Sequence, residues 1–224
     1  MVSAERLGTW SASSSAMSTR PLAQQVVPGA NGAESATAED GAVRPRDSLF
    51  HWCGTVDAIS HSTGQIEKIS LLEAYFGAVA EQTIAPAARF FAGQIFPPGD
   101  TRTIGVGWSL VVDTIQDLSR ISATEFRARY ERHGDLGDVA AEAFAGRLPS
   151  GIAVVDIATW ADQLADAADE DRRRVLLREM LARLSSFEAK YLVKLVGGEL
   201  RIGVEVADIE TALARRVRRE ATRP

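Results

Sequence analysis

The most informative stretch of this 224-residue chain is residues 188–203, EAKYLVKLVGGELRIG. It begins as a helical segment, reaches a double glycine at Gly197-Gly198, and then places Arg201 directly before Ile202-Gly203. Apolar residues follow every three or four positions over residues 206–217, a spacing that predicts an amphipathic helix. The stretch therefore indicates two helices joined by a glycine-rich turn that carries a basic residue.

The same order of features occurs once earlier in the chain. Three pairs are 105 residues apart: Leu71-Leu72 with Leu176-Leu177, Arg89 with Lys194, and Gly93 with Gly198. Ile104-Gly105-Val106 and Ile202-Gly203-Val204 are 98 apart, a difference of seven residues that falls around Pro97-Pro98. A constant offset across several features indicates an internal repeat. We expect two similar halves that pack about a pseudo-two-fold axis.

Local signals agree with an all-α fold. Serine and glutamate three residues apart form capping boxes at Ser122-x-x-Glu125 and Ser185-x-x-Glu188, each of which predicts a helix start. Gly134 follows a helical segment and has the position of its C-terminal stop. Strand-like alternation occurs only at residues 151–157 and is too weak to count. We predict one multi-helix domain over residues 47–224.

The first 46 residues have a different composition, rich in Ser, Ala, Gly, Pro and Thr, with few large apolar side chains. Such a segment buries too little surface to offset its ordering entropy, so we expect a disordered extension. It lacks the basic start and apolar core of a secretory signal. Because no apolar run reaches transmembrane length, we also expect no membrane association.

Charge is unevenly distributed. The net charge is −5, yet residues 171–224 hold 13 basic and 8 acidic residues, while residues 1–170 hold 12 basic and 22 acidic ones. This asymmetry is typical of a face that meets a polyanion. A basic helix lying in solvent explains the charge equally well.

Motifs for catalysis are missing. None of the three lysines lies in a Lys-x-Asp-Gly setting, and there is no Gly-x-x-x-x-Gly-Lys phosphate loop. The three histidines show no metal-ligand spacing, and the single cysteine, Cys53, excludes an internal disulfide. We therefore expect no catalytic or metal site, and we expect Cys53, Trp108 and Trp160 to pack in the core.

The candidate binding elements are three glycine-containing turns, each before a predicted helix. They span residues 102–107, 133–138 and 197–203. Glycine allows close approach of backbone amides to a phosphate, and a helix N-terminus adds partial positive charge. Asp135 and Asp138 would repel phosphate, so we assign them to N-capping. Ordinary helix–helix turns are the alternative. The candidate DNA-binding residues are Arg102, Gly105, Gly107, Gly134, Gly137, Lys194, Gly198, Arg201 and Gly203.

At these turns the chain resembles the N-terminal DNA-binding domain of ATP-dependent DNA ligases, over about residues 47–217. The matching pieces occur in the family's order: Ile66–Leu72, Phe96–Trp108, His133–Ala140 and Glu188–Gly203. The resemblance implies two pseudo-symmetric helical halves that grip a nicked duplex through the minor groove and the sugar–phosphate backbone, without reading sequence. It also implies a role in DNA repair, recombination or replication.

The resemblance also sets what this chain would not do alone. The family's adenylation domain, which carries the AMP-bound lysine, and its oligonucleotide-binding domain have no counterpart here. We therefore expect no cofactor on this chain, with ATP and Mg²⁺ acting on a catalytic domain elsewhere. A separate ligase catalytic chain is one partner that would carry that domain. The expected location is a bacterial cytoplasm, with the nucleoid. The alternatives are a helical module that docks onto such a chain, a truncated inactive remnant, and an enzyme in its own right.

Overall fold

The computed structural model describes residues 45–222, which contain ten α-helices and no strand. The predicted all-α class is therefore confirmed. The expected disordered extension lies outside the described residues, except for Pro45 and Arg46, which begin a short 3₁₀ helix. The elements are η1 (Pro45–Asp47), α1 (Leu49–His61), α2 (Gln65–Ala78), α3 (Glu81–Phe91), α4 (Trp108–Ser119), α5 (Ala123–His133), α6 (Leu136–Ala143), α7 (Val154–Ala165), α8 (Glu170–Arg183), α9 (Ser186–Val196) and α10 (Val206–Ala221).

The internal repeat is visible in the helix boundaries. Adding 105 to the first residues of α1, α2 and α3 gives the first residues of α7, α8 and α9, and adding 98 to that of α4 gives that of α10. The sequence had indicated the last three pairs, whereas the pairing of α1 with α7 is new. Helices α5 and α6 lie between the two halves of the repeat.

The turns that end α3 and α9 share one backbone conformation. Gly93 and Gly198 have φ values of 71° and 70°, in the left-handed region that favours glycine. In each turn the glycine N–H and the next N–H donate back into the preceding helix, at 3.0 and 2.9 Å after α3 and at 3.2 and 2.8 Å after α9. The glycine offset of 105 residues therefore reflects a repeated three-dimensional turn.

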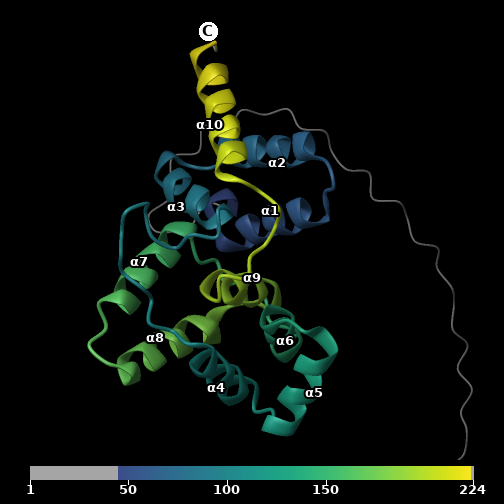
Figure 1. Cartoon of the computed structure of the whole chain (residues 1–224), viewed down its shortest axis with the longest axis vertical. Helices are drawn as coiled ribbons and strands as arrows, with labels where there is room; N and C mark the ends of the chain where they lie inside the picture. The colour runs from purple at the N-terminus through teal and green to yellow at the C-terminus, as the bar shows by residue number, and fades with distance from the viewer. Residues whose placement is uncertain (1–44, 223–224) are drawn as a thin grey trace, which may run out of the picture. The chain divides into compact units, whose positions relative to one another are not determined.

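Helix packing is reciprocal between the halves, as Figure 1 shows. Helix α4 packs on α8 while α10 packs on α2, and α1 packs on α9 while α3 packs on α7. The equivalent residues Ser48 and Ala153 form an isolated antiparallel bridge, next to a 2.7 Å hydrogen bond from Leu49 N–H to the Ile152 carbonyl. Pairing between equivalent residues is what a pseudo-two-fold axis produces, so the expected symmetry is confirmed.

The local end signals are confirmed as well. Ser122 and Ser185 each form both hydrogen bonds of a capping box with the glutamate three residues later. Gly134 closes α5 with φ 65°, and its N–H donates to the Tyr130 carbonyl at 2.7 Å. Residues 151–157 run into α7 and form no strand.

Of the three residues expected in the core, two are buried and one is exposed. Cys53 and Trp160 are buried, and the Trp160 Nε1–H donates to the Leu176 carbonyl at 3.1 Å. Trp108, expected in the core, is 56% exposed, so that expectation is wrong. The physical reason is its position: it is the first residue of α4, where its ring packs on Phe126 and Tyr130 of α5 and lines an open hollow.

None of the helices in residues 45–222 combines the length and the apolar character that crossing a membrane requires.

Candidate nucleic-acid interface

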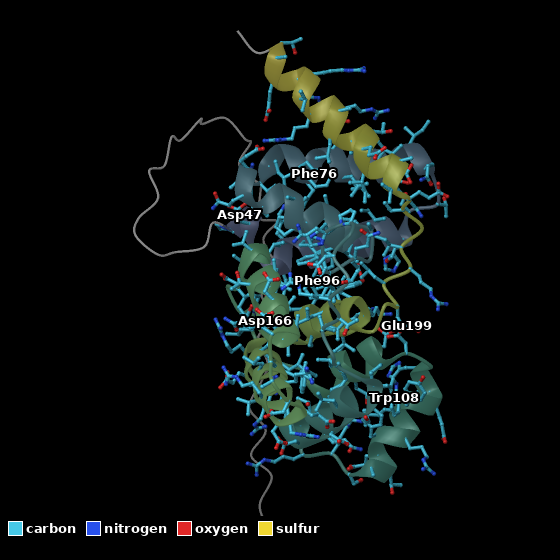
Figure 2. The ribbon with its side chains drawn as sticks, turned by 60° about the vertical axis from the view of Figure 1, so that its left-hand side comes forward. Asp47, Phe76, Phe96, Trp108, Asp166 and Glu199 are labelled. Carbon is cyan, nitrogen blue, oxygen red and sulfur yellow. The ribbon has the colours of Figure 1, made fainter. Side chains whose placement is uncertain are left out.

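The three predicted glycine turns meet in one place. A hollow of about 270 Å³, the first hollow, is formed by the start of α4, the turn between α5 and α6, and the end of α9. Figure 2 labels Trp108 and Glu199, which both line it, at neighbouring positions on the same side of the molecule. Four candidate residues contribute to its lining: Gly107, Gly134, Gly137 and Lys194.

A second hollow of about 230 Å³ adjoins the first. It lies between the turn after α3, at Gly93, and residues 198–204. The turn after α9 contributes to both hollows, because Gly197 and Glu199 line the first while Gly198 and Leu200 line the second. The second hollow contains the remaining candidates of that turn: Gly198, Arg201 and Gly203.

The start of α4 leaves its backbone amides open at the first hollow. Gly107 is the N-cap of α4, and no side chain caps the helix there. The equivalent start of α10 likewise has no side-chain cap, although the Asp208 carboxylate accepts from the N–H of its N-cap residue, Glu205, at 2.8 Å. Unpaired amides and the helix dipole together favour an anion at such a position.

Arg201 offers the most accessible positive charge of the candidate set. Its side chain is 80% exposed, and the one ion pair it forms within residues 45–222, with Glu199, is 3.8 Å long. A guanidinium that is solvated and loosely paired can reach a phosphate without breaking a structural contact. A DNA contact by Arg201 stays a prediction, and the exposure of its side chain is compatible with it.

A DNA contact by Arg102 stays a prediction, because the structure shows this residue in ion pairs within the protein. Arg102 lines neither hollow, and its guanidinium lies 2.8 Å from both Asp100 and Asp162 and 3.8 Å from Asp166. It also stacks over the Phe96 ring at 4.9 Å. Three carboxylates balance its charge, so Arg102 fastens the long loop before α4 to α7. Neighbouring Gly105 stands beside the first hollow, next to its lining residue Val106.

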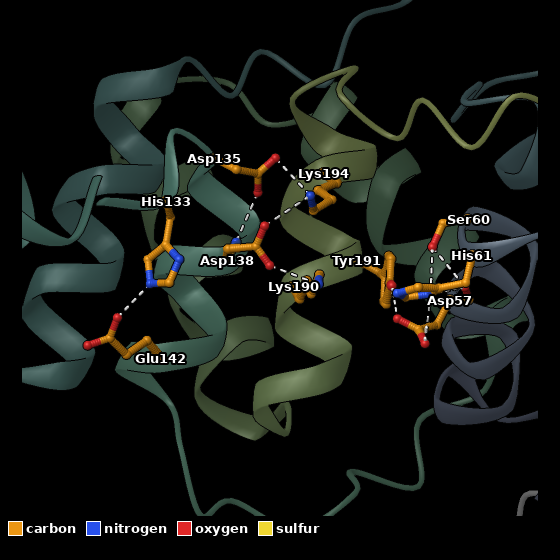
Figure 3. Close-up of polar contacts among 10 residues, drawn as sticks. All are labelled: Asp57, Ser60, His61, His133, Asp135, Asp138, Glu142, Lys190, Tyr191 and Lys194. Atoms are coloured by element: carbon orange, nitrogen blue, oxygen red, sulfur yellow. Dashed lines mark hydrogen bonds and ion pairs between the residues drawn. The ribbon is translucent and has the colours of Figure 1, made fainter. Parts of the chain in front are cut away.

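Lys194 lines the first hollow, but its charge is also balanced. Its Nζ lies 2.7 Å from Asp135 and 3.4 Å from Asp138, and Lys190 Nζ lies 2.8 Å from Asp138, as Figure 3 shows. These contacts join the N-terminus of α6 to α9. Asp135 is the N-cap of α6, as predicted, because it accepts from Asp138 N–H at 2.9 Å. A direct DNA contact by Lys194 stays a prediction, while its structural role is evident.

Gly137 is a packing residue. It is buried, and a Cβ atom at this position would lie 2.5 Å from the Lys190 carbonyl oxygen of α9. The absence of a side chain therefore allows α6 to contact the backbone of α9. Its expected contact with phosphate through a backbone amide stays a prediction, and Gly137 does line the first hollow.

Two basic residues that the sequence reading missed support the Ile-Gly-Val turns. Lys68 Nζ donates to the carbonyls of Ile202 and Gly203 at 2.9 and 3.0 Å. Arg173 Nε lies 2.6 Å from where a Cβ of Gly105 would be. Lys68 and Arg173 are themselves 105 residues apart. A basic side chain from each half of the repeat therefore lies against the Ile-Gly-Val turn of the other half. The repeat offset of 105 residues was the sequence signal that could have identified both residues.

The contacts of Asp138 predict a pH-dependent stability. Burial raises the pKa of this carboxyl, but the hydrogen bond from Lys190 and the charges of both lysines outweigh burial and hold the pKa below its usual value. A lowered folded-state pKa stabilises the protein above the unfolded value of about 4, and this stabilisation is lost as the pH falls through the folded-state pKa.

We therefore expect Asp138→Asn to lower the free energy of unfolding by about 1 kcal/mol at pH 7 and by much less near pH 2.5. Urea unfolding at both pH values measures the difference. Glu210→Gln, which removes an exposed carboxylate on α10, is the control and should change little. An Asp138→Asn effect of equal size at both pH values would contradict the assignment.

Comparison with known proteins agrees with this geometry. A family model described as DNA ligase N terminus matches residues 48–214. A probable DNA ligase of Koribacter versatilis is 33% identical over 168 residues, covering 74% of this chain and 29% of that protein. A probable DNA ligase of Opitutus terrae is 27% identical over 203 residues, with 75% and 20% covered, and DNA ligase 1 of Methanosarcina barkeri is 35% identical over 123 residues, with 54% and 22% covered.

The chain thus spans about a fifth to three tenths of the length of these relatives. The family match runs from the residue before α1 into α10 and so includes both halves of the repeat. The chain belongs to the DNA ligase N-terminus family.

Proposed function

We propose that this chain holds nicked double-stranded DNA without reading its sequence, as the DNA-binding part of an ATP-dependent ligase system that acts in repair, recombination or replication. The observation that carries the proposal is the convergence of the glycine turns of both halves on two adjoining hollows. Exposed Arg201 and the open start of α4 supply positive charge there.

The chemistry of this surface suits the sugar–phosphate backbone. Backbone amides and arginine contact phosphate oxygens whatever the base sequence, so such contacts position a duplex rather than specify it. The adenylation step, with its ATP and Mg²⁺, belongs in this proposal to a catalytic domain outside this chain. A separate ligase catalytic chain would then be a partner.

Salt dependence of binding tests the proposal. We expect duplexes of two unrelated sequences, each with one nick, to bind equally, with a log–log slope against salt of about −4 to −5, since roughly four to six phosphates are neutralised. Fluorescence anisotropy with labelled duplex measures both quantities. Lack of binding at low salt and micromolar protein would contradict the proposal.

Arg201→Ala should weaken binding to all duplexes on the order of tenfold and reduce the magnitude of the salt slope by about 1. Arg183→Ala is the matched control, because this exposed arginine lines a separate hollow between α7 and α8. If both variants lose affinity alike, the effect reflects overall charge and the site assignment is wrong.

A second candidate function is a helical module that docks onto a separate ligase catalytic chain. The exposed apolar side chains of Ile66 and Leu148 favour it, because neither residue lies in the two hollows. Docking of this kind would persist at high salt, and DNA binding would not. Co-purification with a catalytic chain in 0.5 M salt, on the order of what suppresses phosphate contacts, separates the two functions.

A further inference from the structure

Both halves of the repeat expose a large apolar side chain at the same place. Trp108 begins α4 and is 56% exposed, and Val206 begins α10 and is 54% exposed. The two residues are 98 positions apart, the offset that relates the Ile-Gly-Val turns before them. A side chain as large as tryptophan loses stabilisation when it stays in water, so a pair of such exposures at equivalent positions indicates a surface that becomes covered.

The Trp108 ring is held in position on one side only. Its edge contacts are with Phe126 and Tyr130 of α5, at centroid distances of 6.4 and 5.9 Å and near-perpendicular ring planes. The ring lines the first hollow beside Val106, and Val204 lines the second hollow just before Val206. Each hollow is therefore lined by a valine that lies two residues before the first residue of a helix, Val106 before α4 and Val204 before α10.

The surroundings decide which occupant fits. Trp108 and Val204 line the two hollows together with glycine turns, the uncapped start of α4 and Arg201. Val206 lines neither hollow and follows Val204 by two residues. A protein interface has an apolar centre with a polar rim, whereas a DNA groove presents apolar sugar faces between regularly spaced phosphates. This combination of apolar side chains, backbone amides and a guanidinium matches the groove.

We propose that Trp108 and Val206 pack against deoxyribose faces of the bound duplex, at two positions related by the two-fold symmetry of the duplex backbone, with Trp108 making the larger contact. The inference rests on the proposed function and adds an apolar component to it. Because an apolar contact releases no counterions, it contributes to affinity without contributing to the salt slope.

Binding measurements separate this component from the phosphate contacts. We expect Trp108→Ala to lower affinity for nicked duplex on the order of tenfold with an unchanged salt slope, Trp108→Phe to lose less, and Val206→Ala to lose about two- to threefold. Arg201→Ala changes the slope and serves as the comparison. Val217→Ala is the control for a general loss of exposed apolar surface, since Val217 is equally exposed near the far end of α10.

A direct readout uses tryptophan fluorescence in the full chain carrying Trp10→Phe. Trp52 and Trp160 are buried, so acrylamide quenching then reports on Trp108. We expect added nicked duplex to reduce quenching of the wild-type Trp108 signal and to have no such effect in Trp108→Ala. Urea unfolding of each variant verifies that the fold is retained, and Trp108→Phe keeps the test valid if the alanine variant is unstable.

The possible results separate the apolar contact by Trp108 from the proposed DNA binding as a whole. If wild type binds with the expected salt slope while Trp108→Ala and Trp108→Phe bind equally well, the inference is overturned and the proposed function stands. If wild type fails to bind duplex at all, the proposed function fails first. Self-association in sedimentation that Trp108→Ala abolishes would assign this surface to a second copy of the chain and would also overturn the inference.

Discussion

Glu188→Ala should lower the free energy of unfolding by about 3–5 kcal/mol, because the variant leaves two buried and two partly buried donors without an acceptor. Glu188 is 0% exposed. Its carboxylate accepts from Ser150 N–H at 3.0 Å and Ser150 Oγ–H at 2.7 Å, and from Ser185 N–H at 2.9 Å and Ser185 Oγ–H at 2.7 Å. Alanine removes all four acceptor contacts and opens a cavity between α9 and the segment before α7.

The first half of the repeat supports this assignment, because a carboxylate also binds the start of its third helix, α3. In that half the carboxylate belongs to a residue outside the helix. There Asp47 accepts from Ala80 N–H at 2.7 Å and from Thr83 Oγ1–H at 3.0 Å. Ala80 and Thr83 stand 105 residues before Ser185 and Glu188. A buried carboxylate therefore caps the third helix of each half, although the two carboxylates come from different positions of the repeat.

Chemical denaturation of three variants tests the assignment. Glu188→Gln keeps the shape but replaces one acceptor oxygen with a donor, so its loss should be intermediate. Glu131→Ala, which removes an exposed glutamate on α5, should change stability by less than about 0.5 kcal/mol. A Glu188→Ala effect below about 1 kcal/mol would mean that water replaces the carboxylate and that the network contributes little.

The helices were predictable because their signals are local. Capping boxes at Ser122 and Ser185, the stop at Gly134 and the spacing of apolar residues each act within one or two turns of backbone. The repeat was found through glycines, since the left-handed turn at Gly93 and Gly198 demands that residue. The pairing of α1 with α7 was missed because equivalent positions there share one residue type, at Asp57 and Asp162, and otherwise little more than apolar character, which many side chains satisfy.

The candidate site was predictable in its backbone and much less so in its charges. Each glycine turn forms at the predicted residues, because turn geometry is encoded where it occurs. The ion-pair partners of the basic residues are not encoded locally. Asp162 is 60 residues from Arg102, and Asp135 is 59 residues from Lys194. Sequence shows that a lysine is present but does not show which carboxylate tertiary packing brings to it. Trp108 was misjudged because residue type favours burial, whereas exposure depends on what covers the first turn of α4.

Gly137→Ala should destabilise the protein by about 1–3 kcal/mol, even though alanine is the better helix former. The gain in helix propensity is at most about 1 kcal/mol. Against it, the new Cβ would meet the Lys190 carbonyl oxygen at 2.5 Å and Lys194 Cγ at 2.7 Å. A backbone carbonyl inside α9 has no room to yield, so α6 must move away from α9.

That displacement should be measurable in DNA binding as well as in stability. Moving the start of α6 pulls Asp135 and Asp138 from Lys194 and shifts the turn at Gly134 within the first hollow. We therefore expect weaker duplex binding by protein that is still folded, together with a lower midpoint in urea. Gly54→Ala is the matched control, because a Cβ there meets nothing within 4 Å, and it should stabilise the chain by about 0.5–1 kcal/mol. If the two alanine variants behave alike, close packing of α6 on α9 is not what Gly137 provides.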